Sequence, residues 1–413
     1  MTLRRLKSAA IVGVALATLA SVAVTAGSAG AQSERGPKDS YIIANIEIPG
    51  ESTLAVPFFN DGALLGVETA KKAGRNIQYE RIPAGAVNAS LAEQAFLQSA
   101  AKNPDAIIAL TSSNVFIPVG PKVVASGVPT IALASPSEGV KDGTSGGENI
   151  FLIRPLNEQT YSSLLEYMCT DLKKQLKLKE MKIALNTVQT AFGATVQEVV
   201  NREIGDYKGC SVVTTQTNSA VATDLTQQAL AIKDSGANAI LSANFPNPSG
   251  VLVNQLRQNG VTVPFVGGAS LNIAVDSGSI QNLDNLWASD DCVPELEKDP
   301  KAKKFVKTFT AKYGYAPNYS SAQLHDIMQF VSETIKAQGH EPAAIIKGLS
   351  KVNYDGVCDF KTDDNHVMGT SVTVYKYKGG TDKTKQLARQ FQLQELTEEE
   401  IVLITTTTRA PGT

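Results

Sequence analysis

The chain has 413 residues, of which 43% are hydrophobic and 19% are charged, and its formal net charge is −2. This length exceeds one ordinary hydrophobic core, so two lobes are expected, and the composition is that of a soluble globular protein. The near-neutral charge gives no electrostatic reason to expect nucleic acid or an anionic membrane surface as a partner.

Residues 1–31 have the pattern of a secretory signal peptide. A basic start precedes an Ala/Val/Leu run, and Ala29-Gly30-Ala31 fits a signal-peptidase site. The apolar run is short and alanine-rich for a membrane-spanning helix. No cysteine lies near the cleavage region, so no lipid anchor is expected. We therefore expect an exported protein, periplasmic or extracellular, with no stable membrane insertion after cleavage.

After a polar linker at 33–40, buried strands alternate with amphipathic helices. This pattern predicts a parallel sheet with right-handed crossovers. Ser90 and Glu93 fit a capping box at the start of the second helix. The first predicted elements are a strand at 41–48, a helix at 63–74, a strand at 77–82 and a helix at 90–103.

The stretch 104–139 contains two continuous apolar runs, at 106–110 and 129–134, with a short helix between them. Continuous apolar runs are typical of parallel strands covered on both faces, and the open crevice of such a sheet lies beyond the carboxyl ends of its strands. Polar loops stand at both ends, at 111–114 and 135–137. Their N–H groups and a helix N-terminus could hold an anion. The alternative is that they only cap helices; two such loops in adjacent units favour a ligand crevice.

The glycine-rich segment 142–160 breaks this rhythm, and we place a crossing to a second lobe near Ile153-Arg154-Pro155. The alternation then restarts, which predicts a second lobe of the same kind. Its predicted elements are helices at 160–176, 194–205, 223–236 and 251–260, and strands at 181–187, 210–216, 237–245 and 263–268. Further along the chain we predict a strand at 286–294, helices within 299–352, strands within 353–380 and a polar tail from 386.

This order of elements resembles the type I periplasmic solute-binding proteins, in particular the branch of branched-chain amino acid (Leu/Ile/Val) ABC importers. The resemblance covers residues 40–380 and is carried by segments 105–114, 127–139, 191–200, 260–271, 309–339 and 353–360. It implies an α/β fold of two doubly wound parallel-sheet lobes that close on a small ligand.

The resemblance also implies that the chain passes between the lobes at three hinge crossovers. Lobe 1 would contain 40–153 and 290–354, and lobe 2 would contain 154–289 and 355–385, with a polar tail at 386–413. The hinge candidates are residues 154–155, 289–291 and 355–357.

The resemblance places ligand-binding residues at strand ends of both lobes. Lobe 1 would present backbone amides and hydroxyls to a ligand carboxylate, and lobe 2 would place aromatic rings over the ligand. Core packing is nevertheless the commoner fate of a phenylalanine. The candidates are Ser112, Ser113, Asn114, Ala134 and Ser135 in lobe 1, Phe192, Phe245, Ala269 and Ser270 in lobe 2, and Phe58 in the first strand–helix loop.

The sequence departs from the family pattern at Gly268-Ala269-Ser270, where amino-acid binders typically carry an acidic residue that pairs with the ligand ammonium. An unpaired ammonium in a closed cleft is strongly unfavourable. We therefore expect a ligand without an α-ammonium group, such as an apolar or aromatic carboxylate or an amide. Asp276 or Asp326 could supply the charge by another route, which keeps amino acids open.

Four cysteines form an even set, as expected for an exported protein with disulfides. We favour Cys169–Cys210, which would join a helix to a nearby strand, and Cys292–Cys358, which would join two segments near the lobe junction. Free buried thiols are the alternative. No Cys-x-x-Cys pair is present, and the three histidines are scattered, so no metal site and no cofactor are expected.

The resemblance implies a monomeric binding protein whose partners are a small-molecule ligand, an ABC permease and its ATPase subunits. A ligand sensor that presents its cargo to a receptor is the alternative, since the same fold serves both roles. A secreted enzyme is disfavoured: we expect no Gly-x-Ser-x-Gly nucleophile elbow of a hydrolase, there is no phosphate-binding loop or dinucleotide fingerprint, and the histidines have no partnering nucleophile pattern. The acidic pairs at 290–291 and 363–364 fit solvated faces.

Overall fold

A computed structural model of the chain describes residues 39–45, 56–85 and 87–393. The predicted signal peptide and the last part of the predicted tail, 394–413, lie outside the described residues. In the described ranges, no helix combines the length and apolar character that crossing a bilayer requires.

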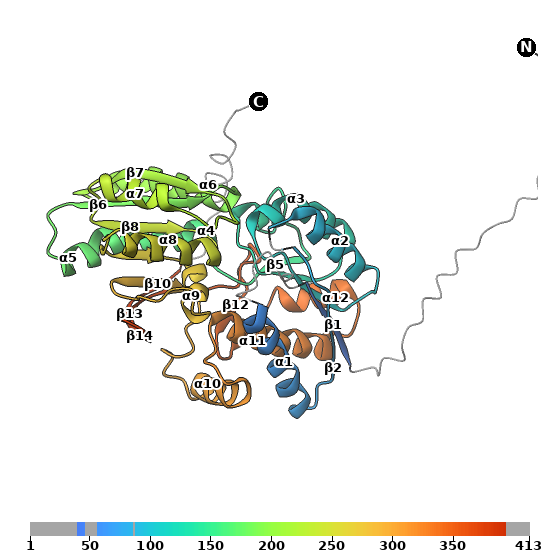
Figure 1. Cartoon of the computed structure of the whole chain (residues 1–413). Coiled ribbons are helices and arrows are strands. Elements are labelled where there is room, and N and C mark those ends of the chain that lie inside the picture. Colours follow the sequence, from blue (N-terminus) through green and yellow to red (C-terminus); the bar gives the residue numbers. More distant parts are fainter. Residues whose placement is uncertain (1–38, 46–55, 86, 394–413) are drawn as a thin grey trace, which may run out of the picture. The chain divides into compact units, whose positions relative to one another are not determined.

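The first lobe is built on a five-stranded sheet in the order β2-β1-β3-β4-β5, in which every pairing is parallel (Figure 1). Ala109 at the end of β3 lies opposite Ala132 at the end of β4. The polar loops that follow these strands therefore leave the sheet side by side, as the apolar runs predict. The strands are β1 Ser40–Ala44, β2 Ile77–Arg81, β3 Ala106–Ala109, β4 Thr130–Ala132 and β5 Ile150–Leu152.

Helices from two distant parts of the sequence pack on this sheet. Leu324 and Phe330 of α11 share one buried core with Ile42 of β1 and Ile108 of β3, so the segment after residue 291 returns to the first lobe. Helix α11 begins where the Asn318 side chain accepts hydrogen bonds from the backbone N–H groups of the first turn. The helices are α1 Val56–Lys72, α2 Ala89–Ala100, α3 Ser113–Ser126, η1 Ser137–Gly139, α10 Pro300–Tyr313, α11 Tyr319–Gln338 and α12 Pro342–Leu349.

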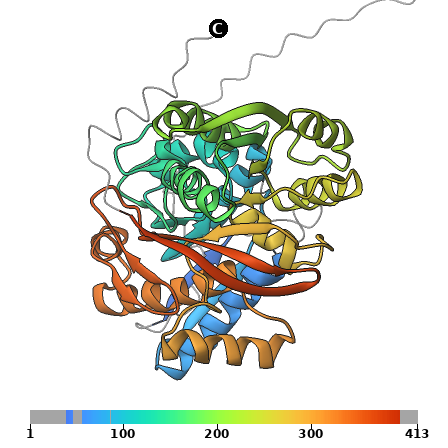
Figure 2. The ribbon, with the colours of Figure 1, turned by 90° about the vertical axis from the view of Figure 1, so that its left-hand side faces the viewer.

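The second lobe is built on a seven-stranded sheet in the order β14-β13-β10-β9-β8-β6-β7. Strands β10, β9, β8, β6 and β7 are parallel, and the β13–β14 hairpin, red in Figure 2, adds two antiparallel strands. The strands are β6 Met181–Val188, β7 Cys210–Asn218, β8 Ala239–Ala243, β9 Phe265–Gly267, β10 Leu286–Asp290, β13 Ser371–Gly379 and β14 Asp382–Gln392. The helices are α4 Asn157–Tyr167, η2 Met168–Leu172, α5 Lys173–Gln175, α6 Ala191–Glu203, η3 Ile204–Asp206, α7 Thr226–Asp234, α8 Pro246–Gln258 and α9 Ala269–Asp276.

Strand β14 differs from the sequence prediction, which places a polar tail from residue 386. Residues 386–392 continue β14 and pair with β13, where Gln386 lies opposite Lys376. The strand is polar because it lies at the edge of the sheet, and its Leu387 is 58% exposed. An edge strand of this composition lacks the apolar alternation that identifies strands in a sequence.

The third passage between the lobes also differs from its predicted position at 355–357. The short hairpin of β11 (Asn353–Asp355) and β12 (Asp359–Lys361) packs with Phe360 in the core of the first lobe, together with Met368. The next core residue of the second lobe is Val374. The chain therefore crosses at about 369–371, where a Cβ atom on Gly369 would lie 2.2 Å from Pro155 Cδ of the first crossing.

Both predicted disulfides are present, and no described cysteine is free. Cys169 of η2 is bonded to Cys210 at the start of β7, within the second lobe. Cys292, just after β10, is bonded to Cys358 between β11 and β12. The second disulfide therefore holds the segment after β10 against the β11–β12 hairpin.

The close approach of α1 to α11 gives a test of the fold. A Cβ atom on Gly62 would lie 2.3 Å from the backbone oxygen of Ser321, which cannot move without shifting α11. We expect Gly62→Ala to lower the free energy of unfolding by about 1–3 kcal/mol, as overpacked cores do. Gly205→Ala is the control because a Cβ atom there meets nothing within 4 Å. Urea unfolding measures both; equal stability of the two variants would contradict this packing.

Candidate functional site

A pocket with a cavity volume of about 100 Å³ lies at the polar loops that follow β3 and β4. Residues of both lobes line it, together with residues of the first crossing and α4. The lining residues are Thr111, Ser112, Ser113, Leu133, Ala134, Ser135, Arg154, Pro155, Asn157, Thr160, Tyr161, Phe192, Phe245, Gly268, Ala269 and Ser270.

The wall from the first lobe is made of hydroxyl groups and a helix N-terminus. Helix α3 begins at Ser113, after a three-residue loop that follows β3, so its positive end opens at the pocket. The Asn157 side chain donates a hydrogen bond to Ser113 Oγ (3.1 Å), and the Asn157 N–H donates to the Ser135 carbonyl oxygen (2.9 Å). The Ala134 N–H is occupied, since it donates to the Leu110 carbonyl oxygen (2.7 Å).

The wall from the second lobe is aromatic. The rings of Phe192 at the start of α6 and Phe245 just before α8 are nearly parallel, with centroids 6.2 Å apart and an interplanar angle of 19°. Tyr161 of α4 meets the Phe192 ring edge-on at 5.7 Å, and its hydroxyl donates to the Ser242 carbonyl oxygen (3.3 Å). Both phenylalanines are only half-buried, as expected for rings that face a pocket.

The residue after β9 must be small for this wall to form. A Cβ atom on Gly268 would lie 3.0 Å from the Tyr161 hydroxyl oxygen, so a larger residue would displace the tyrosine. Helix α9 then begins at Ala269, and Ala269 and Ser270 in its first turn line the pocket. A second helix N-terminus therefore opens at the cavity, opposite that of α3 in the other lobe.

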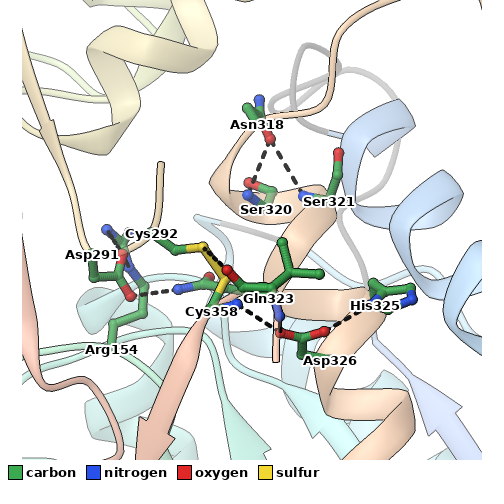
Figure 3. Close-up of a disulfide and its surroundings, with 11 residues drawn as sticks. Arg154, Asp291, Cys292, Asn318, Ser320, Ser321, Gln323, His325, Asp326 and Cys358 are labelled. Carbon is green, nitrogen blue, oxygen red and sulfur yellow. Dashed lines mark hydrogen bonds and ion pairs between the residues drawn. A yellow bond between two sulfur atoms is a disulfide. The ribbon is translucent and has the colours of Figure 1, made fainter. Parts of the chain in front are cut away.

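Arg154 is the one charged side chain among the described residues that line the pocket, and none of them is acidic. Its Nε donates to Asp291 Oδ1 (3.0 Å) and its Nη2 lies 2.8 Å from the same oxygen. Figure 3 shows the two side chains next to each other. Its guanidinium also lies 4.5 Å from the centre of the Tyr319 ring. Burial alone would lower the pKa of Arg154, but the charge of Asp291 raises it, so Arg154 stays cationic.

Most of the predicted ligand-binding residues meet in this pocket, but Asn114 and Phe58 do not line it. Asn114 donates its side-chain N–H to the Val87 carbonyl oxygen (2.9 Å). Phe58 lies inside α1 instead of a loop, because α1 already begins at Val56, and its ring packs edge-on against Tyr315 at 5.2 Å.

The two acidic residues considered as partners of a ligand ammonium also lie outside the pocket lining. Asp326 accepts hydrogen bonds from the N–H groups of Val357 and Cys358 (2.7 and 2.8 Å; Figure 3). Asp276 is at the far end of α9 from the pocket, and burial raises its pKa to about 6. Neither carboxylate supplies the negative charge that an ammonium group would need.

Several lining residues were missed in the sequence. Arg154 and Pro155 were assigned only to a hinge, and α4 was predicted to begin at 160, which left Asn157 outside it. The helix begins at Asn157 because Gln159 accepts a hydrogen bond from the Leu156 N–H (3.0 Å), a side-chain cap that the sequence already contains. The sequence does not mark Tyr161 as a pocket residue, since a tyrosine on an amphipathic helix usually packs in the core.

Residues 143–147, Gly-Thr-Ser-Gly-Gly, match the Gly-x-Ser-x-Gly spacing of a hydrolase nucleophile elbow. Ser145 is buried, and its hydroxyl donates to the Ile117 carbonyl oxygen (2.8 Å). The segment lies between η1 and β5, not on a strand-to-helix turn, so it does not present a nucleophile. Across the described residues, no three His, Cys, Asp or Glu side chains gather closely enough to hold a metal ion.

Solved structures with this fold include several binding proteins. A solute-binding protein of an R. palustris ABC transporter in complex with benzoate has 17% identity and a TM-score of 0.74, over 87% of this chain and 98% of that chain. A second R. palustris protein, in complex with 4-hydroxybenzoate, has 18% identity and a TM-score of 0.71, over 86% and 98%. The branched-chain amino acid transporter substrate-binding protein of Streptococcus pneumoniae, in complex with isoleucine, has 21% identity and a TM-score of 0.69, over 85% and 99%.

At these identities the structures show a shared fold. No curated protein matches the chain. Residues 50–383 match the family model described as periplasmic binding protein, which confirms the family predicted from the sequence. Because this match spans most of the chain, and the two lobes with their pocket follow the same architecture, the chain belongs to the periplasmic binding protein family.

Proposed function

We propose that this protein is the extracytoplasmic solute-binding component of an ABC importer, and that its ligand is a small carboxylate without an ammonium group. The observation that carries the proposal is the charge of the pocket: Arg154 is cationic, and no described lining residue is acidic. An ammonium group would be desolvated there without a counter-charge, which is strongly unfavourable.

The polar wall fits a carboxylate. The N-termini of α3 and α9 both open at the cavity, and each carries partial positive charge. The hydroxyls of Ser113 and Ser270 are hydrogen-bond donors that can turn toward an anion. Arg154 adds a positive charge even though Asp291 already takes part of its hydrogen-bonding capacity.

The aromatic wall favours a ligand whose carboxylate is attached to a planar, apolar group. Phe192 and Phe245 present two half-exposed rings to the pocket, and Tyr161 packs edge-on against Phe192. Stacked aromatic contacts contribute beyond their buried area. The benzoate and 4-hydroxybenzoate complexes of the R. palustris proteins, which share this fold, support an aromatic acid as the ligand class.

The remaining parts of the proposal follow from the family. The ligand is held between two lobes, predicted from the sequence as residues 40–153 with 290–354 and residues 154–289 with 355–385. The core of the first lobe extends beyond residue 354, so we place the third boundary at about 369–371. The lobes close by hinge motion, and the loaded monomer meets a permease with its ATPase subunits. The two disulfides and the leader at 1–31 support export, and the protein is a carrier with no catalytic role.

A ligand panel tests the proposed class. We expect benzoate and 4-hydroxybenzoate to raise the melting temperature by several degrees, since a ligand at a hundredfold excess over its dissociation constant adds about 2.7 kcal/mol of stability. Leucine and isoleucine should give no shift. Differential scanning fluorimetry followed by calorimetric titration measures both groups. Tight leucine binding with no response to the acids would refute the proposed ligand.

A carboxylate placed in the pocket tests its charge preference. We expect Ser270→Asp to weaken benzoate binding at least tenfold, about 1.4 kcal/mol, because the new anion would face the ligand carboxylate. Gln281→Asp adds the same charge at an exposed position outside the pocket and should keep the affinity within twofold. Isothermal titration compares the two variants, and equal losses would mean that the pocket does not hold the carboxylate.

A further inference from the structure

Glu158 is a buried carboxylate next in sequence to a residue that lines the pocket. It follows Asn157, which lines the pocket, in the first turn of α4, and it is only 3% exposed. Neither of its oxygens has a hydrogen-bond partner of standard geometry. A buried ionised carboxylate with unsatisfied oxygens is expensive, so this position favours the neutral acid.

The groups around Glu158 come from both lobes. Ser137 and Glu138 belong to η1, which follows the pocket loop of the first lobe, and Arg202 belongs to α6 of the second lobe. Burial and the charge of Glu138 raise the pKa of Glu198 of α6, and α3, which packs against η1, contacts α6, so the two lobes meet at this seam. One oxygen of Glu138 is itself buried without a partner.

Together these groups bring the pKa of Glu158 close to neutral pH. The pKa of Glu158 is raised from about 4.5 to about 7: burial raises it most, the Ser137 hydroxyl and the backbone N–H of Glu158 lower it, the charge of Glu138 raises it and that of Arg202 lowers it. Arg202 is shared with Glu203, to which its Nη2 donates at 2.6 Å. Separation of the lobes would admit water and move Glu138 away, which returns the carboxyl toward its ordinary pKa.

We propose that Glu158 is a proton-binding site that couples closure of the two lobes, and therefore ligand binding, to pH. The inference rests on the proposed function only in taking closure to accompany ligand capture. Closure buries Glu158 between η1 and α6, and the carboxyl takes up one proton from solvent as it is buried. No other reactant is needed, and opening releases the same proton.

The sign of the effect follows from linkage. The closed form binds the proton more tightly, so it gains stability relative to the open form as pH falls below about 7. The gain ends when the open form is protonated too, near the ordinary carboxyl pKa of about 4.5. Above the closed-form pKa both forms are ionised, and affinity no longer depends on this group.

Two measurements test the coupling, one with a ligand and one without. We expect benzoate affinity to rise at least tenfold from pH 8 to pH 5.5, a range in which benzoate stays ionised because such acids titrate near pH 4. Glu158→Gln, which mimics the neutral acid, should bind at pH 8 as tightly as the wild type does at pH 5.5 and change less than twofold with pH. Glu180→Gln removes a carboxylate from an exposed site and should keep the wild-type dependence.

The ligand-free measurement is small-angle scattering. Lowering the pH should shift the wild type toward the more compact, closed form, and Glu158→Gln should be shifted toward it at pH 8 already. Glu138→Gln is the second variant: it removes the charge that faces Glu158, so its transition should move to lower pH. A wild type whose affinity and compactness are both constant from pH 8 to 5.5 would overturn the proposal. If the acids do not bind but compactness follows pH as described, the proposed ligand fails and the proton site stands.

Discussion

The ion pair between Arg154 and Asp291 is the interaction on which the rest of the site depends. Arg154 lies on the first crossing between the lobes and Asp291 on the second, so the pair holds two of the three crossings together. Gln323 of α11 donates a hydrogen bond to the same carboxylate (Figure 3). The Tyr319 ring lies against the guanidinium. The pair therefore fixes one edge of the pocket, and it also decides the charge that a ligand meets. An ion pair between two crossings leaves no packed core to disrupt there, which suits the proposed closure of the lobes.

The second wall of the pocket is held by a separate buried network behind α9. Asn272 of α9 donates to Asp290 Oδ2 (2.7 Å) and accepts from the Tyr377 hydroxyl (2.9 Å), and Tyr375 donates to the same oxygen of Asp290 (2.7 Å). Burial raises the pKa of Asp290 to about 8. The β13 strand thus anchors α9, and with it Ala269 and Ser270, although β13 lies far from them in sequence. Among the described residues, Asp290 Oδ1 has no hydrogen-bond partner, and a buried network of this kind fixes orientation more than it adds stability.

The sequence predicts the parts of this protein that follow from local pattern. Continuous apolar runs identify the parallel strands, and the polar residues that end them, such as Ser112 and Ser135, mark the pocket because parallel strands end at one edge of the sheet. Local pattern does not predict a feature that depends on a residue far away in the sequence. β14 is a strand because β13 offers an unpaired edge, and Arg154 reads as a linker residue until Asp291 is placed beside it. The burial of Glu158 likewise depends on η1 and α6, which no local pattern brings together.

The charges on the two sides of the pocket support one consistent picture. In the proposed function, an anionic ligand brings a negative charge to a pocket where Asp291 already balances part of the charge of Arg154. The loss of a negative charge nearby would therefore favour closure of the lobes over this ligand. Glu158 and Glu138 are two of the carboxylates at the seam between the lobes, and a proton on Glu158 provides that loss. Because closure itself takes up the proton, an ammonium ligand would also bind more tightly as pH falls, but less steeply, since its positive charge favours an ionised Glu158. The direction of the pH dependence therefore reports the proton taken up on closure, and its steepness reports the sign of the ligand charge.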